Sequence, residues 1–258
     1  MDLKLVNRRV LITGSSQGLG YGIAEGFLRE SAKVIITGRS EERLNDAYKK
    51  LSETYGANNL YFLKTDFTNI ESVKKTYSFI LDKLGGLDIL VNNVGTGTSV
   101  PDAIPSEKDW SFSWNQNFEA SIIATRIFFP LLKVGVNSSI LFISSIAAKE
   151  AFGAPVAYST AKTAINAFAK NISRKVAGNV RVNVLAPGNV FFEGGSWDKK
   201  IKTNKKDVLN LIKNTVPMNR FASLEEIANA ALFLSSDVSS FTTGAVLVVD
   251  GGQTITIP

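Results

Sequence analysis

Two kinds of hydrophobic pattern alternate along the chain. Seven short runs rich in valine, isoleucine and leucine are apolar at almost every position, which is typical of strands buried on both faces. Longer charged segments with helical periodicity, such as 41–56 and 70–85, separate these runs and end at a glycine. The alternation predicts an α/β fold of the Rossmann type, in which helices flank a doubly wound, seven-stranded parallel sheet. The seven runs cover residues 9–14, 33–38, 59–66, 87–93, 138–144, 180–188 and 245–252.

The length and composition suit one compact domain over residues 1–258. The chain has 258 residues, of which 45% are hydrophobic and 20% are charged, and no repeat, low-complexity tract or linker divides it. The first residues run straight into a strand without a signal-like leader. No apolar run approaches the ~20 residues of a membrane span. We therefore expect a cytoplasmic protein without a membrane partner.

Cysteine and histidine are both absent from the sequence. This excludes disulfides, thiolate nucleophiles, serine–histidine–acid triads and metal sites built on either residue, so no metal is expected. Proton transfer near neutral pH then needs another group with a shifted pKa, such as a tyrosine beside a cation. The net charge of +6 indicates a mild preference for anions, and no basic stripe interleaved with aromatic residues supports nucleic-acid binding.

A glycine-rich loop follows the first predicted strand and opens a helix. Gly14, Gly18 and Gly20 have the spacing Gly-x-x-x-Gly-x-Gly. Glycine lets the backbone turn sharply and approach a pyrophosphate, and the free N–H groups at the helix N-terminus favour the anion. The glycines could instead merely end a strand, but the strand–turn–helix context favours dinucleotide binding.

The end of the second predicted strand bears on which dinucleotide binds. An NAD site usually places an acid there to hold the ribose hydroxyls, whereas a 2′-phosphate calls for arginine. Here Gly38 and Arg39 occupy this region, and no carboxylate occurs before Glu41. NADP(H) is therefore favoured over NAD(H), although Arg39 could be a surface residue before a helix and Gln17 supplies no second cation in the glycine loop.

The segment 188–220, after the sixth predicted strand, is the least regular part of the chain. It holds Phe191, Phe192, Trp197 and a cluster of lysines. The segment is either a solvated loop with a surface helix or a mobile substrate lid. Its position at the carboxyl edge of the sheet, where ligands bind in such folds, favours a substrate-lid loop.

Tyr158 and Lys162 stand four residues apart within a helical pattern. They would share one helix face, with Cβ atoms roughly 5–6 Å apart, so the lysine could act on the phenol. The same spacing occurs by chance on helix surfaces, and other motifs must decide between the two interpretations.

Several motifs in order resemble the short-chain dehydrogenase/reductase family, in its single-domain branch that includes 3-oxoacyl-carrier reductases. The resemblance covers nearly the whole chain, and its C-terminal residues 237–252 resemble the last strand and oligomer-forming tail of the family. The motifs are the glycine loop at 13–20, Asp66, Asn92-Asn93-Val94-Gly95, Asn117, the serine of "ISSIAA", Tyr158-x-x-x-Lys162 and Pro187-Gly188.

The interval between serine and tyrosine identifies the serine. Ser145 lies 13 residues before Tyr158, as the family pattern expects, whereas Ser144 would point to the opposite side of a continuing strand. A serine here could also simply cap or end the strand, which would not explain the interval. The resemblance implies the catalytic residues Asn117, Ser145, Tyr158 and Lys162.

Two other polar positions have plain structural alternatives. Asn115 lies close to Asn117, and the interval of 13 residues from Asn117 to Pro130 favours Asn117 by resemblance. Asp66 could be a turn residue before a helix, while the resemblance implies that it contacts the adenine with the Phe67 backbone nearby.

The resemblance also implies which residues hold the cofactor. Asn92 and Asn93 could simply end the fourth strand, and the resemblance implies that they also brace the loop and line the cofactor. Val94 replaces the usual alanine. Phe192 stands where the family often has a threonine that binds the nicotinamide carboxamide. The implied set is Gly14, Ser16, Gln17, Gly18, Leu19, Gly20, Arg39, Asp66, Phe67, Asn93, Gly95, Tyr158, Lys162, Pro187, Gly188 and Val190.

The activity implied by the resemblance is reversible hydride transfer between NADP(H) and a small-molecule carbonyl or secondary alcohol. Tyr158 would donate or accept the proton, Lys162 would stabilise its phenolate, and Ser145 would orient the substrate oxygen. The substrate stays open, and a homotetramer or homodimer is implied. The alternatives are a non-catalytic NADP-binding sensor, or a dehydratase or epimerase on the same fold.

Overall fold

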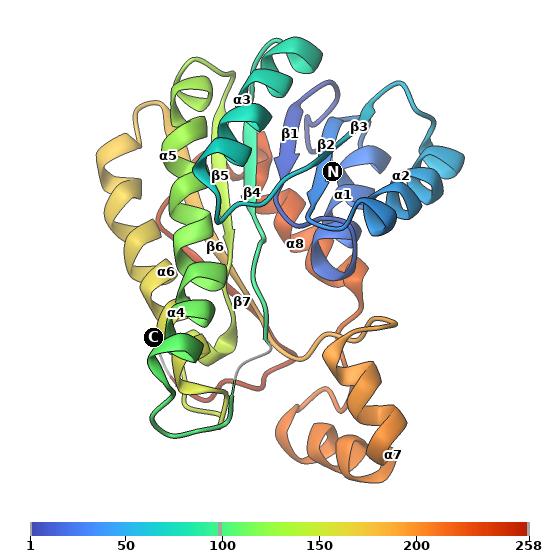
Figure 1. The fold of residues 1–258 in the computed structure, drawn as a ribbon, viewed down its shortest axis with the longest axis vertical. Helices are drawn as coiled ribbons and strands as arrows, with labels where there is room; N and C mark the ends of the chain where they lie inside the picture. Colours follow the sequence, from blue (N-terminus) through green and yellow to red (C-terminus); the bar gives the residue numbers. More distant parts are fainter. Residues whose placement is uncertain (1, 98–99, 257–258) are drawn as a thin grey trace.

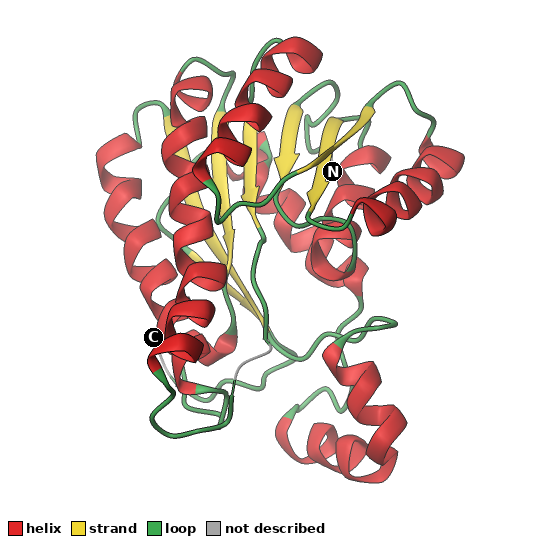
Figure 2. Cartoon of the chain, in the orientation of Figure 1, coloured by secondary structure: helices red, strands yellow, loops and turns green. Residues whose placement is uncertain are grey.

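A computed structural model describes residues 2–97 and 100–256 as a sheet between two helical layers (Figures 1 and 2). Every pairing of neighbouring strands is parallel, which confirms the predicted seven-stranded Rossmann-type sheet. The order reverses between β1 and β4, and ligands bind at such a switch point in open α/β sheets. In spatial order the strands are β3 (Leu60–Lys64), β2 (Lys33–Gly38), β1 (Arg9–Ile12), β4 (Ile89–Asn92), β5 (Ser138–Ile143), β6 (Val180–Pro187) and β7 (Val246–Val249).

The helices cover both faces because successive strand residues point to opposite sides. Val10 and Ile12 of β1 pack in the core beneath α1, α2 and α8, whereas Leu11 between them packs beneath α3, α5 and α6. The helices are α1 (Gly18–Arg29), α2 (Glu41–Tyr55), α3 (Ile70–Leu84), α4 (Glu107–Trp114), α5 (Ala120–Lys133), α6 (Val156–Val176), α7 (Ser196–Thr215) and α8 (Leu224–Ser235). Three short turns complete the fold: the π-helical η1 (Asn115–Glu119) and the 3₁₀ turns η2 (Ile146–Ala148) and η3 (Asp237–Ser239).

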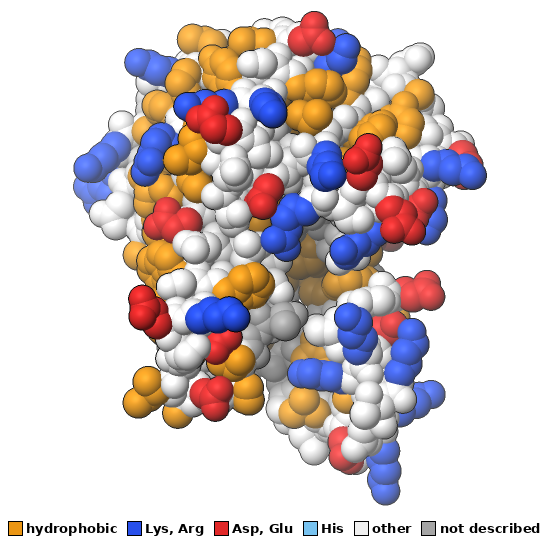
Figure 3. Space-filling model, in the orientation of Figure 1, with side chains coloured by type: hydrophobic (Ala, Val, Ile, Leu, Met, Phe, Trp, Pro, Cys, Tyr) orange, Lys and Arg blue, Asp and Glu red, His pale blue; other side chains and the backbone are white. Residues whose placement is uncertain are grey.

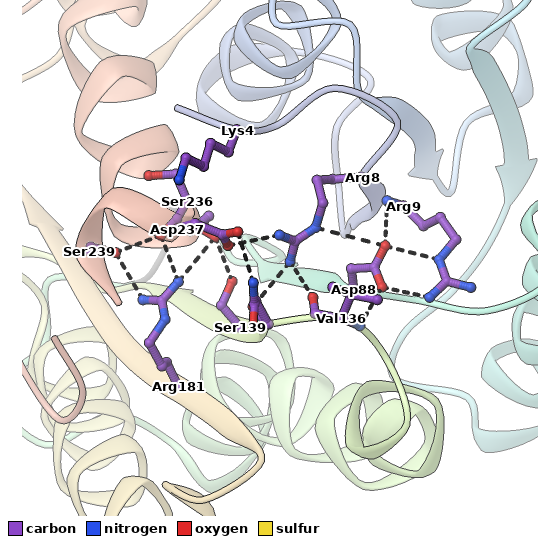
Figure 4. A network of polar contacts seen from close by, with 12 residues as sticks. Lys4, Arg8, Arg9, Asp88, Val136, Ser139, Arg181, Ser236, Asp237 and Ser239 are labelled. Atoms are coloured by element: carbon purple, nitrogen blue, oxygen red, sulfur yellow. Dashed lines mark hydrogen bonds and ion pairs between the residues drawn. The ribbon is translucent and has the colours of Figure 1, made fainter. Parts of the chain in front are cut away.

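A charged network ties the strands together at their amino ends, the edge opposite the predicted site (Figure 4). Asp88, just before β4, accepts hydrogen bonds from Nε and Nη2 of Arg9 at 2.9 and 2.6 Å and from the backbone N–H of Val136 at 3.0 Å. Arg8 donates to Asp237 at 2.8 Å. Burial alone would raise the pKa of Asp88, but the hydrogen bonds from Arg9 and Val136 outweigh it and hold that pKa below its usual value. The charges at this edge therefore satisfy one another.

Most of the segment expected to be a substrate-lid loop is helical. Residues 196–215 form α7, and its backbone leaves helical geometry at Asn204 (φ −150°, ψ 81°). The helix projects away from the sheet (Figure 1). A surface helix can carry lysines spaced three and four residues apart on its polar face. The lysine-rich composition of this segment therefore did not indicate a loop. Its movement as a lid stays a prediction. Within residues 2–97 and 100–256, no helix is long and apolar enough to cross a bilayer.

Candidate active site

One cleft of about 470 Å³ runs along the carboxyl edge of the sheet. Its lining includes residues that closely follow six strands, from β3 to β6 in spatial order. The surface is hollowed between the body of the molecule and the region of α7 (Figure 3). The cleft brings together most of the predicted site residues, while Gly20 and Pro187 do not line it. The predicted residues that do are Gly14, Ser16, Gln17, Gly18, Leu19, Arg39, Asp66, Phe67, Asn93, Gly95, Asn117, Ser145, Tyr158, Lys162, Gly188 and Val190.

The glycine loop has the geometry of an anion cradle. Gly14 and Gly18 have positive φ of 65° and 60°, a conformation that favours glycine. A Cβ atom on Gly20 would lie 2.5 Å from Nδ2 of Asn93, so the third glycine allows the loop to close against the end of β4. Helix α1 begins at Gly18 without a side-chain cap or an acidic residue in its first turn, and its free N–H groups lie at the cleft. These residues fit the pyrophosphate of a dinucleotide.

A second arginine stands beside the position predicted to select the dinucleotide. Arg39 and Arg43 both line the cleft, and Nη1 of Arg43 donates to Oε1 of Gln17 at 3.3 Å. Arg43 lies in the first turn of α2, whose N-cap Ser40 accepts from its backbone N–H. Arg43 was not predicted from the sequence, although its spacing of four residues from Arg39 was an available signal. The glycine loop itself holds no second cation, but Arg43 reaches that loop from α2.

Asp66 has the turn role that the sequence left open, and its position is compatible with the cofactor role. Its Oδ1 accepts from the backbone N–H and the hydroxyl of Thr68 at 2.9 and 2.7 Å, which fixes the turn before α3. The residue also lines the cleft, next to the buried Phe67. The turn role is present, and the adenine contact stays a prediction.

The two serines at the end of β5 make different contacts. Oγ of Ser144 donates to the backbone carbonyl of Lys162 at 3.2 Å and fixes α6 to the sheet. Oγ of Ser145 accepts from the backbone N–H of Ala147 at 3.1 Å and also pairs with the hydroxyl of Tyr158. Ser145, as the sequence spacing indicated, is therefore the serine directed at the tyrosine.

Burial dominates the electrostatics of the tyrosine and the lysine. Burial raises the pKa of Tyr158, and the hydrogen bond with Ser145 lowers it only in part. Lys162 is 5% exposed, and burial lowers its pKa from 10.5 to about 8. Its Nζ donates to the carbonyl of Ile143 at 2.9 Å and lies 5.9 Å from the centre of the Tyr158 ring. The arrangement thus holds a protonated phenol beside an amine that can lose its proton near neutral pH.

Asn117 lies in the π-helical turn η1 rather than in regular helix. It is fully buried, and its Oδ1 accepts from the backbone N–H of Thr96 at 2.9 Å. A Cβ atom on Gly95 would lie 2.8 Å from Oδ1 of Asn117 and 3.1 Å from Nζ of Lys162, so both groups reach the same point. Asn115 is exposed and lies outside the cleft. Asn117 in this widened turn and Lys162 thus lie on the same side of Gly95, and π turns often occur at functional sites.

Three further lining residues, two aromatic and one polar, bear on what the cleft can bind. Phe192 and Trp197 line the cleft, whereas Phe191 lies outside it and packs 6.0 Å from the ring of Phe221. Gln116 is 7% exposed and also lines the cleft. Gln116 was not predicted, because nothing in the sequence pattern distinguishes it from other polar helical residues.

Comparisons with known proteins agree with this arrangement. The family model described as "Enoyl-(Acyl carrier protein) reductase" matches residues 14–254. The 3-oxoacyl-[acyl-carrier-protein] reductase FabG of Chlamydia pneumoniae is 35% identical over 98% of this chain and 100% of that protein. The short-chain dehydrogenase/reductase SDRA of Arabidopsis thaliana is 32% identical over 97% of this chain and 96% of its own.

The fold also matches a solved enzyme. The structure of L-sorbose reductase from Gluconobacter frateurii, complexed with NADPH and L-sorbose, superposes with a TM-score of 0.93 at 31% identity, and the match covers 100% of both chains. Matches of this extent in sequence and fold place the chain in one group of oxidoreductases. The chain belongs to the short-chain dehydrogenase/reductase family.

Proposed function

We propose that the protein is an NADP(H)-dependent oxidoreductase that interconverts a carbonyl and a secondary alcohol. One observation carries the proposal: the Ser145–Tyr158 pair, Lys162 and Asn117 line the same cleft as the glycine loop at the N-terminus of α1. A dinucleotide held by that loop would extend toward the tyrosine. The proposed roles of these side chains follow from their contacts.

NADPH held by the glycine loop and the N-terminus of α1 would supply a hydride for the carbonyl carbon. As the carbon–oxygen π pair moves to oxygen, the hydroxyl of Tyr158 gives its proton to that oxygen, and the product is an alcohol. The raised pKa of Tyr158 keeps the donor protonated at neutral pH. Ser145 hydrogen-bonds the substrate oxygen in advance, a preorganised contact that strengthens as negative charge develops.

Lys162 and Asn117 act on the tyrosine rather than on the substrate. An ammonium at Lys162 stabilises the phenolate that remains after proton transfer, and a pKa of about 8 suits a group that returns a proton to it. Asn117 shares the space beside Gly95 with Nζ of Lys162. We assign Asn117 to the positioning of that amine and of a water molecule that reloads it.

The preference for NADP(H) rests on Arg39 and Arg43 at one end of the cleft, and the NADPH complex of L-sorbose reductase supports it. We expect Arg39→Asp to lower the preference for NADPH over NADH in kcat/KM by about ten- to a hundredfold, because a charged hydrogen bond to the 2′-phosphate is replaced by repulsion. Arg43→Ala is expected to act in the same direction but less strongly.

The control for cofactor choice is Arg174→Ala, which removes an exposed positive charge from α6 outside the cleft. It should leave the ratio of kcat/KM for the two cofactors unchanged. An unchanged ratio in Arg39→Asp would remove Arg39 from the 2′-phosphate site.

The substrate is a carbonyl or alcohol of a class still to be determined. The aromatic side chains of Phe192 and Trp197 at the cleft favour a substrate with an apolar portion. The named relatives suggest two chemistries to test, 3-oxoacyl thioesters and ketoses. A screen of both, followed by the loss of nicotinamide absorbance with NADPH and with NADH, tests the proposal. Oxidation of neither cofactor with any carbonyl would contradict it.

Two alternatives predict different behaviour in that screen. A non-catalytic sensor would bind NADPH but consume none, and a dehydratase or epimerase would convert substrate without net loss of cofactor. The presence of all four implied catalytic side chains in one cleft favours the oxidoreductase over the sensor. We also propose that the protein forms a homodimer or homotetramer. Phe241, just before β7, is fully exposed in the single chain and could be covered at a subunit contact.

A further inference from the structure

Phe192 replaces the threonine expected from the family resemblance, and its ring lies inside the cleft against the glycine loop. A Cβ atom placed on Gly18 would lie 2.8 Å from Cζ and 3.0 Å from Cε2 of Phe192. The ring is therefore in van der Waals contact with the backbone of Gly18. Because Gly18 is the first residue of α1, the ring lies beside the helix N-terminus whose N–H groups would hold the pyrophosphate.

The ring in this position competes for space with a bound pyrophosphate. Phosphate oxygens need about 2.9 Å to the N–H donors of the loop and about 3.5 Å to carbon atoms on their other side. A ring in contact with Gly18 takes up part of the space beside the first turn of α1 where such a phosphate would lie. We therefore expect a dinucleotide to displace Phe192 from Gly18 when it binds in this cleft.

The backbone around Phe192 is held on both sides, and the carbonyl of Phe192 itself accepts from the N–H of Gly195 at 3.1 Å. The preceding residue is held by Ala222, whose carbonyl accepts from the N–H of Phe191 at 3.0 Å. On the other side, Gly194 has a φ of 76° and donates its N–H to Asp198 in the first turn of α7 at 2.9 Å. A displacement of Phe192 toward α7 can thus be absorbed at Gly194 and passed to the start of that helix.

We propose that Phe192 is a latch on the dinucleotide cleft: its ring closes over Gly18, and NADP(H) binds to the state in which the ring has moved away. The inference rests on the proposed function, because it takes NADP(H) as the ligand of this cleft. Because only open molecules bind NADP(H), the apparent affinity equals the affinity of the open state multiplied by the fraction of molecules that are open. Binding of the cofactor is thereby coupled to the position of α7, which borders the substrate end of the cleft.

The test compares Phe192→Ala with Phe191→Ala. Phe191 is the matched control because it is the neighbouring phenylalanine, is 39% exposed and lies outside the cleft. Titration of NADPH fluorescence should give a dissociation constant about tenfold lower for Phe192→Ala than for the unmodified protein. Phe191→Ala should change it by less than about twofold. In stopped-flow mixing, the observed binding rate of the unmodified protein should level off at high NADPH, and that of Phe192→Ala should stay linear.

Each other result has a definite meaning. Weaker binding by Phe192→Ala would overturn the latch and make the ring a contact of the bound cofactor, and unchanged binding would make it mere packing. Phe192→Thr, which restores the residue typical of the family, should also bind NADPH more tightly. Thermal unfolding of both variants serves as the check that they fold. If the unmodified protein binds neither NADPH nor NADH, the proposed function fails along with the latch. Binding without an effect of Phe192 would overturn the latch alone.

Discussion

Replacing Tyr158 by phenylalanine is expected to lower kcat for carbonyl reduction about a thousandfold, because a positioned general acid contributes about 10²–10⁴ to the rate. The change removes one hydroxyl and keeps the ring that packs at the start of α6. The glycine loop and the two arginines are untouched, so the dissociation constant for NADPH should change by less than about twofold. Steady-state rates at saturating cofactor, together with a fluorescence titration, measure the two effects separately.

Tyr61→Phe is the matched control for that variant. Its hydroxyl, on edge strand β3, donates to the carbonyl of Asn58 at 3.4 Å and lies outside the cleft. Activity should be retained there. Full activity in Tyr158→Phe would remove Tyr158 as the proton donor, and lost NADPH binding would show that the phenol mainly shapes the cleft.

Replacing Lys162 by methionine is expected to abolish most activity while making the protein more stable at neutral pH. The loss of activity, at least about a hundredfold, follows from the missing ammonium beside the phenolate. The gain in stability follows from burial, because the difference between a pKa of 10.5 and one of about 8 corresponds to about 3 kcal/mol against the charged lysine. The lost hydrogen bond from Nζ to Ile143 offsets about 1 kcal/mol of that gain.

The pH dependence of this effect has a definite sign. The folded pKa of Lys162 is below its unfolded value, so between about pH 8 and 10.5 the unfolded chain binds more protons. The destabilisation by Lys162 is therefore fully present below pH 8 and fades as the pH rises through this window. The stability advantage of Lys162→Met, measured by urea unfolding, should shrink in the same window. Reduction by the unmodified protein should also slow above about pH 8, as the ammonium is lost.

Lys170→Met is the control on the same helix. Its Nζ donates to the carbonyl of Gly244 at 3.0 Å, but the residue is exposed and outside the cleft. This variant should keep its activity. A Lys162→Met protein that is less stable than the unmodified protein at pH 7 would contradict the buried, unfavourable charge.

The sequence predicted those features that depend on local pattern. Apolar runs located all seven strands because parallel strands buried on both faces have no polar alternation. The interval between Ser145 and Tyr158 pointed to the serine that contacts the tyrosine, since strand alternation separates neighbouring side chains; the catalytic role of Ser145 stays a prediction. Composition was a weaker guide for 188–220, where polar, lysine-rich residues fold as the helix α7.

Features that depend on contacts between distant segments could not be predicted in this way. Arg43 reaches Gln17 only because α2 packs beside the glycine loop, and Gln116 is buried only because η1 turns toward the cleft. The departure at Phe192 was visible in the sequence, but the position of its ring on Gly18 depends on how 189–195 crosses the cleft. Such placements follow from tertiary packing rather than from periodicity.

An isotope experiment tests the central claim, hydride transfer, most directly. NADPH is labelled with deuterium at C4 of the nicotinamide, on the face that the enzyme uses, and transfer of the deuterium to the product is measured. The unmodified protein is incubated with a carbonyl identified in the screen, and the product is analysed by mass spectrometry. We predict an alcohol that carries one deuterium on the former carbonyl carbon, formed in step with loss of the labelled cofactor. A product that forms without deuterium from cofactor labelled on either face, while the cofactor is not consumed, would contradict hydride transfer.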